Sequence, residues 1–222
     1  SFDDLLDFVG RLRDLSGKPV GIKTVFGDSS WLDGLCDSVE RCGADRAPDF
    51  ITLDGGDGGT GAAPLALMDN VGLTLRESLP LLVDGLAKRG LRERIKVICA
   101  GKLVTPAEVA WAYCAGADAV NTARGFMFSI GCIQAMRCHT NTCPTGVTTH
   151  DHRLQAGLDP HTKAEQAAMY VQKIQKDVNS IAHSCGVAHA RALTRRHVRI
   201  VQGNGLSVSL ADLHPPVMAE RV

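Results

Sequence analysis

The stretch IKVICAGKLVTPAEVAWAYCAGADAVNTARG, residues 95–125, contains one pattern twice. A short strand-like run, first 95–100 and then 118–122, leads into a small-residue turn that is followed by a helix-like segment. In the first repeat, Thr105 and Glu108 have the spacing of a capping box, and Pro106 stands at the first helical position. Short apolar strands that alternate with helices predict a parallel sheet covered by helices.

The same alternation extends in both directions and gives four strand–helix units. The predicted strands cover residues 19–26, 50–53, 95–100 and 118–122. The predicted helices run from 1 to 16, from 29 or 30 to about 42, from 74 to 89, from 105 onward, and from 122 to about 136.

The alternation stops after residue 136. A loop is expected over 137–162, then a long helix over 162–185 with Gly186 as its C-cap, and a mixed, polar tail from 187. Four strands cannot close a (β/α)8 barrel, which needs eight strands and typically ~250 residues. The pattern therefore fits either a small open α/β sheet or half of a barrel.

Composition excludes several classes of protein. The 24 basic and 24 acidic residues balance, which argues against a nucleic-acid-binding domain. The 45% hydrophobic content argues against disorder, and no apolar run is long enough to cross a membrane. The start of the chain is charged and helix-periodic rather than a signal peptide, so we expect a cytoplasmic protein. It begins with Ser, which suggests an excerpt or a processed chain.

Eight cysteines divide into two groups. Without an export signal, and in a chain long enough for a core, a disulfide framework is not expected. Five cysteines stand in strand-like or helix-like segments and are interpreted as structural: Cys36, Cys42, Cys99, Cys114 and Cys185. The other three, Cys132, Cys138 and Cys143, have the spacing C-x5-C-x4-C.

Three thiolates in one loop can bind an iron–sulfur cluster or zinc, whereas the alternative is coincidence combined with core packing. The spacing lacks the paired CxxC of zinc fingers. His139 lies inside the loop, either as a fourth ligand or as an ordinary polar loop residue.

The segment DGGDGGTGAAP, residues 54–64, directly follows the strand 50–53. Its glycines allow a ligand to approach the backbone closely, and Asp57 and Thr60 are the polar side chains inside it. It matches neither a P-loop nor a dinucleotide fingerprint. Ligands of α/β proteins bind at the carboxyl ends of strands, so this position favours a site over a merely flexible loop.

Three further positions carry positive charge near predicted strand ends. Lys23 lies within an apolar strand, where it either faces a site or reaches solvent. Lys102 and Arg124 lie in small-residue turns that each open a helix. Adjacent turns of this kind can bind a phosphate, although each can also be an ordinary connection.

Four motifs occur in an order that resembles the synthase domain of the FMN-binding glutamate synthase family. They are GIKTVFG at 21–27, GGDGGTGAAP at 55–64, AGKLVTPAEV at 100–109 and GCIQAMRCHTNTCPTGV at 131–147, and the resemblance runs from about 19 to 201. CHTNTCP is the most specific part. The resemblance implies that residues 1–136 form the last four βα units of a (β/α)8 TIM barrel. Residues 137–222 would be its iron–sulfur loop and C-terminal helical extension.

The family carries FMN and a three-iron cluster (3Fe-4S), and the resemblance assigns residues to both. It implies that Lys23 and Asp57 are catalytic residues facing flavin and substrate. The flavin and oxoacid site would include Gly58, Gly59 and Thr60, and the FMN phosphate would be held by Gly101, Lys102, Ala123, Arg124 and Gly125. The cluster ligands would be Cys132, Cys138 and Cys143.

The implied reaction reduces 2-iminoglutarate, formed from 2-oxoglutarate and ammonia, to L-glutamate. The electron donor would be ferredoxin or a pyridine-nucleotide reductase subunit. As half of a barrel, the chain alone is expected to bind FMN weakly, to lack activity and to form a homodimer through its open strand edges. The alternatives are an FMN oxidoreductase that acts on another oxoacid or imine, and a cofactor-free structural or zinc-binding module.

Overall fold

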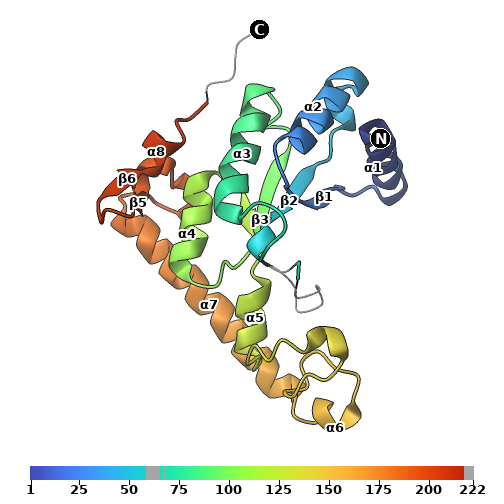
Figure 1. Cartoon of the computed structure of the whole chain (residues 1–222), viewed down its shortest axis with the longest axis vertical. Coiled ribbons are helices and arrows are strands. Elements are labelled where there is room, and N and C mark those ends of the chain that lie inside the picture. Colours follow the sequence, from blue (N-terminus) through green and yellow to red (C-terminus); the bar gives the residue numbers. More distant parts are fainter. Residues whose placement is uncertain (59–65, 68, 218–222) are drawn as a thin grey trace.

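The computed structural model describes residues 1–58, 66, 67 and 69–217 (Figure 1). In this part of the chain, four strands form one parallel sheet in the order β1-β2-β3-β4. Helix α1 (Phe2–Ser16) comes first and is followed by the βα units. The first two units are β1 (Ile22–Val25) with α2 (Ser30–Cys42) and β2 (Phe50–Asp54) with α3 (Leu75–Lys88). The next two are β3 (Lys96–Ala100) with α4 (Pro106–Ala115) and β4 (Ala119–Val120) with α5 (Ala123–Ser129). The predicted four parallel βα units are confirmed, and they are consistent with part of an α/β barrel.

The two faces of the sheet differ in burial. Side chains alternate between the faces of a strand, and one face presents Ile51, Leu53, Val97 and Cys99, which are all fully buried against apolar side chains of the helices. The other face, which we call the open face, keeps solvent exposure along its strands. It includes Lys23, Val25, Phe50, Asp54, Ile98 and Ala100. In a closed barrel this face would line the interior.

Local signals account for the helix starts and ends. Ser1 and Asp4 form a capping box at α1, and Gly17, with φ 62°, ends that helix. At α4, Thr105 Oγ1 accepts a hydrogen bond from Glu108 N at 3.4 Å, and the Glu108 carboxylate accepts one from Thr105 N at 2.8 Å. The capping box predicted from Thr105 and Glu108 is therefore present.

The helix expected up to residue 136 is wrong in its length, because α5 ends at Ser129. Gly131 has φ 104° and donates its N–H to Phe128 O at 3.0 Å, while Cys132 N donates to Met127 O at 2.9 Å. This pair of hydrogen bonds is a Schellman motif, which stops an α-helix. The first cysteine of the loop is thus fixed by the helix end rather than lying inside the helix.

The predicted loop 137–162 contains a short helix, α6 (His152–Gln155), and the next helix begins earlier than expected. Helix α7 (Pro160–Ser184) starts after Asp159, whose carboxylate accepts hydrogen bonds from the N–H groups of His161 and Thr162. Helix α7 packs along α4 and α5, so residues beyond 137 cover the βα units (Figure 1).

The C-terminal tail is more ordered than its polar composition suggested. It forms an antiparallel hairpin of β5 (Arg199–Val201) and β6 (Ser207–Ser209), followed by α8 (Leu210–Leu213). Arg195 is buried and binds both carboxylate oxygens of Asp84 on α3, at 2.7 and 3.1 Å. Its guanidinium also donates to His214 O at 2.8 Å, which ties the tail to the sheet-covering helices.

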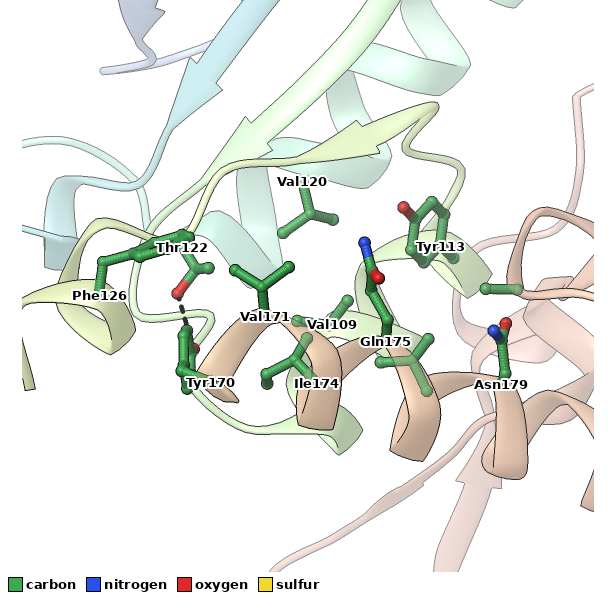
Figure 2. Close-up of a pocket in the computed structure, with 12 residues that line it drawn as sticks. Val109, Tyr113, Val120, Thr122, Phe126, Tyr170, Val171, Ile174, Gln175 and Asn179 are labelled. Carbon is green, nitrogen blue, oxygen red and sulfur yellow. Dashed lines mark hydrogen bonds between the residues drawn. The ribbon is translucent and has the colours of Figure 1, made fainter. Parts of the chain in front are cut away.

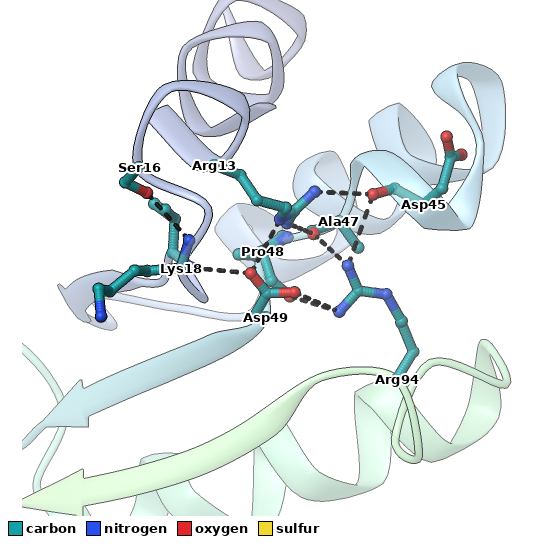
Figure 3. A network of polar contacts seen from close by, with 9 residues as sticks. Arg13, Ser16, Lys18, Asp45, Ala47, Pro48, Asp49 and Arg94 are labelled. Atoms are coloured by element: carbon teal, nitrogen blue, oxygen red, sulfur yellow. Dashed lines mark hydrogen bonds and ion pairs between the residues drawn. The ribbon is translucent and has the colours of Figure 1, made fainter. Parts of the chain in front are cut away.

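A polar network joins three segments at the amino end of the sheet (Figure 3). Asp49, just before β2, accepts hydrogen bonds from Val20 N at 2.7 Å and Arg13 Nε at 2.9 Å, and Arg94 Nη1 lies 3.1 Å from its other oxygen. Both arginines also donate to Ala47 O. The network holds α1, β2 and the segment before β3 together, far from the strand ends where ligands bind.

No helix in the described part of the chain combines the length and the apolar character needed to cross a membrane.

Candidate functional site

Lys23 forms an ion pair on the open face of the sheet. Its Nζ lies 2.5 Å from Asp54 Oδ2, and the two side chains are 61% and 20% exposed. In the parallel register Lys23 pairs with Thr52, so Asp54 lies two residues further toward the carboxyl end of the neighbouring strand. Of the two alternatives for Lys23, the structure shows a side chain on the open face that reaches solvent, and its role in a site stays a prediction. Asp54 was missed as a site residue, although strand alternation from Thr52 places it on this face.

Asp57 lies in a short 3₁₀ helix, Gly56–Gly58, that follows β2. Its Oδ1 accepts a hydrogen bond from Leu75 N at 3.2 Å, so the carboxylate satisfies a free N–H at the start of α3. Gly58 ends the 3₁₀ helix, while Gly59 and Thr60 lie outside the described residues.

A pocket of about 160 Å³ brings three of the predicted residues together at the carboxyl end of the sheet. Asp57, Gly101 and Lys102 line it, with Gly101 in a backbone conformation of φ 130°. The remaining lining residues were not predicted: Leu75, Arg76, Leu103, Glu108 and Trp111. The pocket thus joins the connection after β2 to the connection after β3.

Each basic side chain that lines this pocket has an interaction partner close by. Lys102 Nζ pairs with Asp69 Oδ1 at 2.8 Å, and the Arg76 guanidinium lies 4.9 Å from the centre of the Trp111 ring. Trp111 Nε1 is a buried donor that has no hydrogen-bond partner among the described residues. Burial raises the pKa of Glu108, but hydrogen bonds from Thr105 and Val104 and the charge of Arg76 hold it below its usual value. An acceptor group that entered the pocket would meet an available indole N–H.

The second half of the predicted phosphate site lies in a different place. Ala123, Arg124 and Gly125 form the first turn of α5, next to the turn after β3 because Asn121 N donates to Cys99 O at 2.8 Å. They do not line the 160 Å³ pocket. Gly125 also has a packing reason to be glycine, since a Cβ there would collide with the Tyr170 hydroxyl.

A larger pocket of about 460 Å³ lies between β4, α4, α5 and α7 (Figure 2). Its walls are mostly apolar, with Val120, Phe126, Val171 and Ile174 among them, and the amides of Gln175 and Asn179 are on one side. Thr122 and Tyr170 join across one end, with their hydroxyl oxygens 3.2 Å apart. None of the predicted site residues lines this pocket, which lies beside β4 at the edge of the sheet.

The three loop cysteines are positioned by separate local structures. Cys132 follows the Schellman motif of α5, Cys138 begins a 3₁₀ turn (Cys138–Thr140), and Cys143 is buried shortly after Asn141, which has φ 61°. Figure 1 shows the loop beyond α5, beside the first turns of α7 and around α6. All eight cysteines lie in the described residues, and none of them is paired in a disulfide there.

Cys143 differs from the other loop cysteines in its surroundings. Burial raises its pKa, but hydrogen bonds from the Thr145 hydroxyl and from the backbone N–H groups of Thr148 and Thr145 outweigh burial and lower the pKa to about 6. Thr145 Oγ1 lies 3.4 Å from Sγ. Thr148 Oγ1 is buried and has no hydrogen-bond partner in the part of the chain that the structure describes. These donors stabilise a thiolate, which is the form that binds metals.

The described residues contain no group of three His, Cys, Asp or Glu side chains arranged to hold a single metal ion. The preformed zinc site of the structural-module alternative is therefore not found, and His139 is exposed, as an ordinary polar loop residue would be. In an iron–sulfur cluster each cysteine binds a different iron atom, so the sulfurs need not converge on one point. The thiolate-stabilising surroundings of Cys143 fit that kind of ligand.

Three of the remaining cysteines behave as buried apolar residues. Burial raises the pKa of Cys36 to about 11 and the pKa of Cys99 and Cys114 to about 12, so these thiols stay protonated. Their structural interpretation is confirmed. Cys42 is exposed at the last position of α2, and Cys185 is the C-cap of α7.

Comparison with known proteins agrees with the motifs. Residues 1–188 match the family described as the conserved region in glutamate synthase. The glutamate synthase large subunit-like protein YerD of Bacillus subtilis is 41% identical over 210 residues, which cover 95% of this chain and 40% of that protein. The archaeal glutamate synthase [NADPH] of Methanocaldococcus jannaschii is 31% identical, over 93% of this chain and 40% of that protein.

A ferredoxin-dependent glutamate synthase of Pyropia yezoensis is 37% identical over 94% of this chain, but the match covers 13% of that longer protein. The chain spans about 40% of the length of the first two relatives. Because the family match extends over most of its residues, the chain belongs to the glutamate synthase family.

Proposed function

We propose that this chain is part of a flavin- and iron–sulfur-dependent glutamate synthase. The complete enzyme would reduce 2-iminoglutarate, formed from 2-oxoglutarate and ammonia, to L-glutamate. The observation that carries the proposal is that Lys23 on β1 reaches Asp54 at the carboxyl end of β2, beside the pocket that Asp57, Gly101 and Lys102 form after β2 and β3, in a member of this family. Ligands of such sheets bind at these ends.

FMN would bind at the carboxyl end of the sheet, with its phosphate near Gly101 and Lys102 on one strand end and residues 123–125 on the next. The orphaned indole N–H of Trp111 and the guanidinium of Arg76 make this end of the sheet receptive to an anionic group. Bound FMN would supply hydride transfer to an imine carbon.

Lys23 would act on the substrate through its ammonium group. The ion pair with Asp54 holds Nζ in one place on the open face, where it can donate a hydrogen bond to a substrate carboxylate or imine. Because Asp57 is occupied at the start of α3, we assign it the role of shaping the site, with Lys23 the residue that contacts substrate.

Cys132, Cys138 and Cys143 would hold the cluster, which would supply one-electron transfer between the donor and the flavin. The donor is either ferredoxin or a pyridine-nucleotide reductase, because relatives named for ferredoxin and for NADPH are both similar to this chain.

The test compares the isolated chain with the longer polypeptide of which we propose it is a part. With 2-oxoglutarate, ammonia and a chemical reductant, we expect the longer polypeptide to form glutamate. The isolated chain should bind FMN weakly and form none, because half of the flavin site is absent.

In the longer polypeptide, Lys23→Met should abolish glutamate formation while FMN and iron content stay unchanged. Lys18→Met, at an exposed lysine before β1, is the matched control and should keep activity. Absence of glutamate formation by the flavin- and iron-loaded polypeptide, or full activity of the isolated chain, would overturn the proposal.

A further inference from the structure

The loop that carries Cys143 is held in shape by hydrogen bonds of its own. Thr149 Oγ1 donates to Asn141 O at 2.6 Å, and His150 N donates to Asn141 Oδ1 at 2.7 Å. Gln155 on α6 donates through Nε2 to Thr149 O at 2.7 Å. These contacts close residues 141–149 into a compact turn, so the groups that face the sulfur are fixed before any ligand arrives.

Two threonine hydroxyls belong to this turn, and one of them contacts the sulfur. Thr145 Oγ1 lies 3.4 Å from Cys143 Sγ, and Thr148 Oγ1 is buried and has no hydrogen-bond partner among the described residues. A buried hydroxyl without an acceptor is costly, so native proteins rarely keep one. The sulfur of a cysteine that binds an iron–sulfur cluster carries more negative charge than the sulfur of a free thiol. It would accept hydrogen bonds from both threonine hydroxyls.

We propose that Thr145 and Thr148 are positioning residues that donate hydrogen bonds to the Cys143 sulfur and thereby raise the reduction potential of the cluster bound there. The inference rests on the proposed function, because it requires the cluster. Reduction adds one electron, and part of its charge spreads onto the cysteine sulfurs. Hydrogen-bond donors to those sulfurs stabilise the reduced state and make reduction easier.

The test is an anaerobic redox titration of the chain, in which dithionite supplies the electron and electron paramagnetic resonance follows the cluster. Thr145→Val and Thr148→Val remove one hydroxyl each. We expect iron and sulfide content to be retained, and the ratio of reduced to oxidised cluster at a fixed solution potential to fall about tenfold for each variant. For one electron, this is a shift of about 59 mV toward negative potential.

Two controls separate this role from a general effect on the loop. Thr142→Val removes an exposed hydroxyl that bonds to Thr140 at 2.7 Å, and it should leave the potential unchanged. Thr145→Ser and Thr148→Ser keep the donor and should restore the wild-type value.

An intact cluster whose potential is the same in the wild type and both valine variants would overturn this inference and leave the proposed function standing. A wild-type chain without iron or sulfide would overturn this inference, whereas glutamate formation by the longer polypeptide tests the proposed function separately. A negative shift in the valine variants with rescue by serine would establish the inference.

Discussion

The Tyr170 hydroxyl occupies the space where a side chain on residue 125 would lie. It donates to Val104 O at 2.9 Å and lies 3.2 Å from Thr122 Oγ1, and the Tyr170 ring packs edge-on against Phe126. Gly125 therefore has a packing function whether or not a phosphate binds at the start of α5. The sequence pointed to the glycine through its place in a turn, but the tyrosine lies 45 residues away, beyond what local pattern can reveal.

We expect Gly125→Ala to lower the free energy of unfolding by about 1–3 kcal/mol, because the new methyl group displaces Tyr170 and its hydrogen bonds. Urea denaturation measures the change. Gly203→Ala, at a glycine with open space around it, is the control and should stay within about 0.5 kcal/mol of the wild type. Equal stability of both variants would show that Tyr170 does not depend on glycine at 125.

Residue patterns located Lys23 but not its partner. Alternation along β1 puts Lys23 on one face, yet only the parallel register with β2 brings Asp54 beside it. Arg76 and Trp111 were missed for a related reason. Both stand in helices, where the sequence pattern indicates only which positions are packed and which are exposed to solvent. Their meeting at one pocket depends on how α3 and α4 lie together.

At the scale of elements, the predicted βα units are present, and capping residues set where their helices begin and end. The strands and the capping box at Thr105 were predictable because each depends on a few neighbouring residues. The length of α5 was not, since the apolar residues after Ser129 continue a helix-like pattern and only Gly131 in the left-handed region stops it. The β5–β6 hairpin was missed because its three-residue strands carry too short an alternation to be read.

The Asp49 network gives an element-scale prediction about pH. Burial raises the pKa of Asp49, but hydrogen bonds from Val20 and Arg13 and the charges of Arg13 and Arg94 hold it below its ordinary value of 3.8. A carboxyl group whose folded pKa is depressed stabilises the fold above its unfolded pKa, and this contribution is lost as pH falls through the folded pKa.

We therefore expect Asp49→Asn to lower the free energy of unfolding by about 1–3 kcal/mol at pH 7, because hydrogen bonds to a charged group are lost. The difference from the wild type should shrink as the pH falls below about 4. Denaturant titrations from pH 7 to pH 3 measure both. Asp14→Asn, at an exposed position on α1, should show neither effect, and a pH-independent difference for Asp49→Asn would contradict the electrostatic explanation.

At the scale of the whole molecule, the sheet has one well-covered face and one open face. Val25 is 44% exposed on the open face, and β1 and β4 stand at the two edges of the sheet formed by the described residues. The chain also spans about 40% of the length of its relatives YerD and the archaeal enzyme. Exposed apolar side chains and strand edges on such an open sheet favour contact with another chain.

We predict that the isolated chain forms a homodimer through the open face. Light scattering coupled to size-exclusion chromatography should give a mass that rises with protein concentration. Val25→Lys places a charge on the open face and should shift the protein toward monomer, whereas Leu15→Lys, on the exposed side of α1, should have no effect. A monomer at every concentration would contradict the prediction.

The cysteine loop is built from segments inside this chain, namely α5, α6, α7 and the turn 141–149, so we expect the proposed cluster to form in the isolated chain. The most direct test of the account is the iron and acid-labile sulfide content of the anaerobically purified chain, alone and as Cys143→Ser. We predict iron and sulfide with visible absorption in the wild type, their loss in Cys143→Ser, and no change in Cys42→Ser, at an exposed cysteine outside the loop. A colourless wild type without iron, or equal iron in Cys143→Ser, would contradict it.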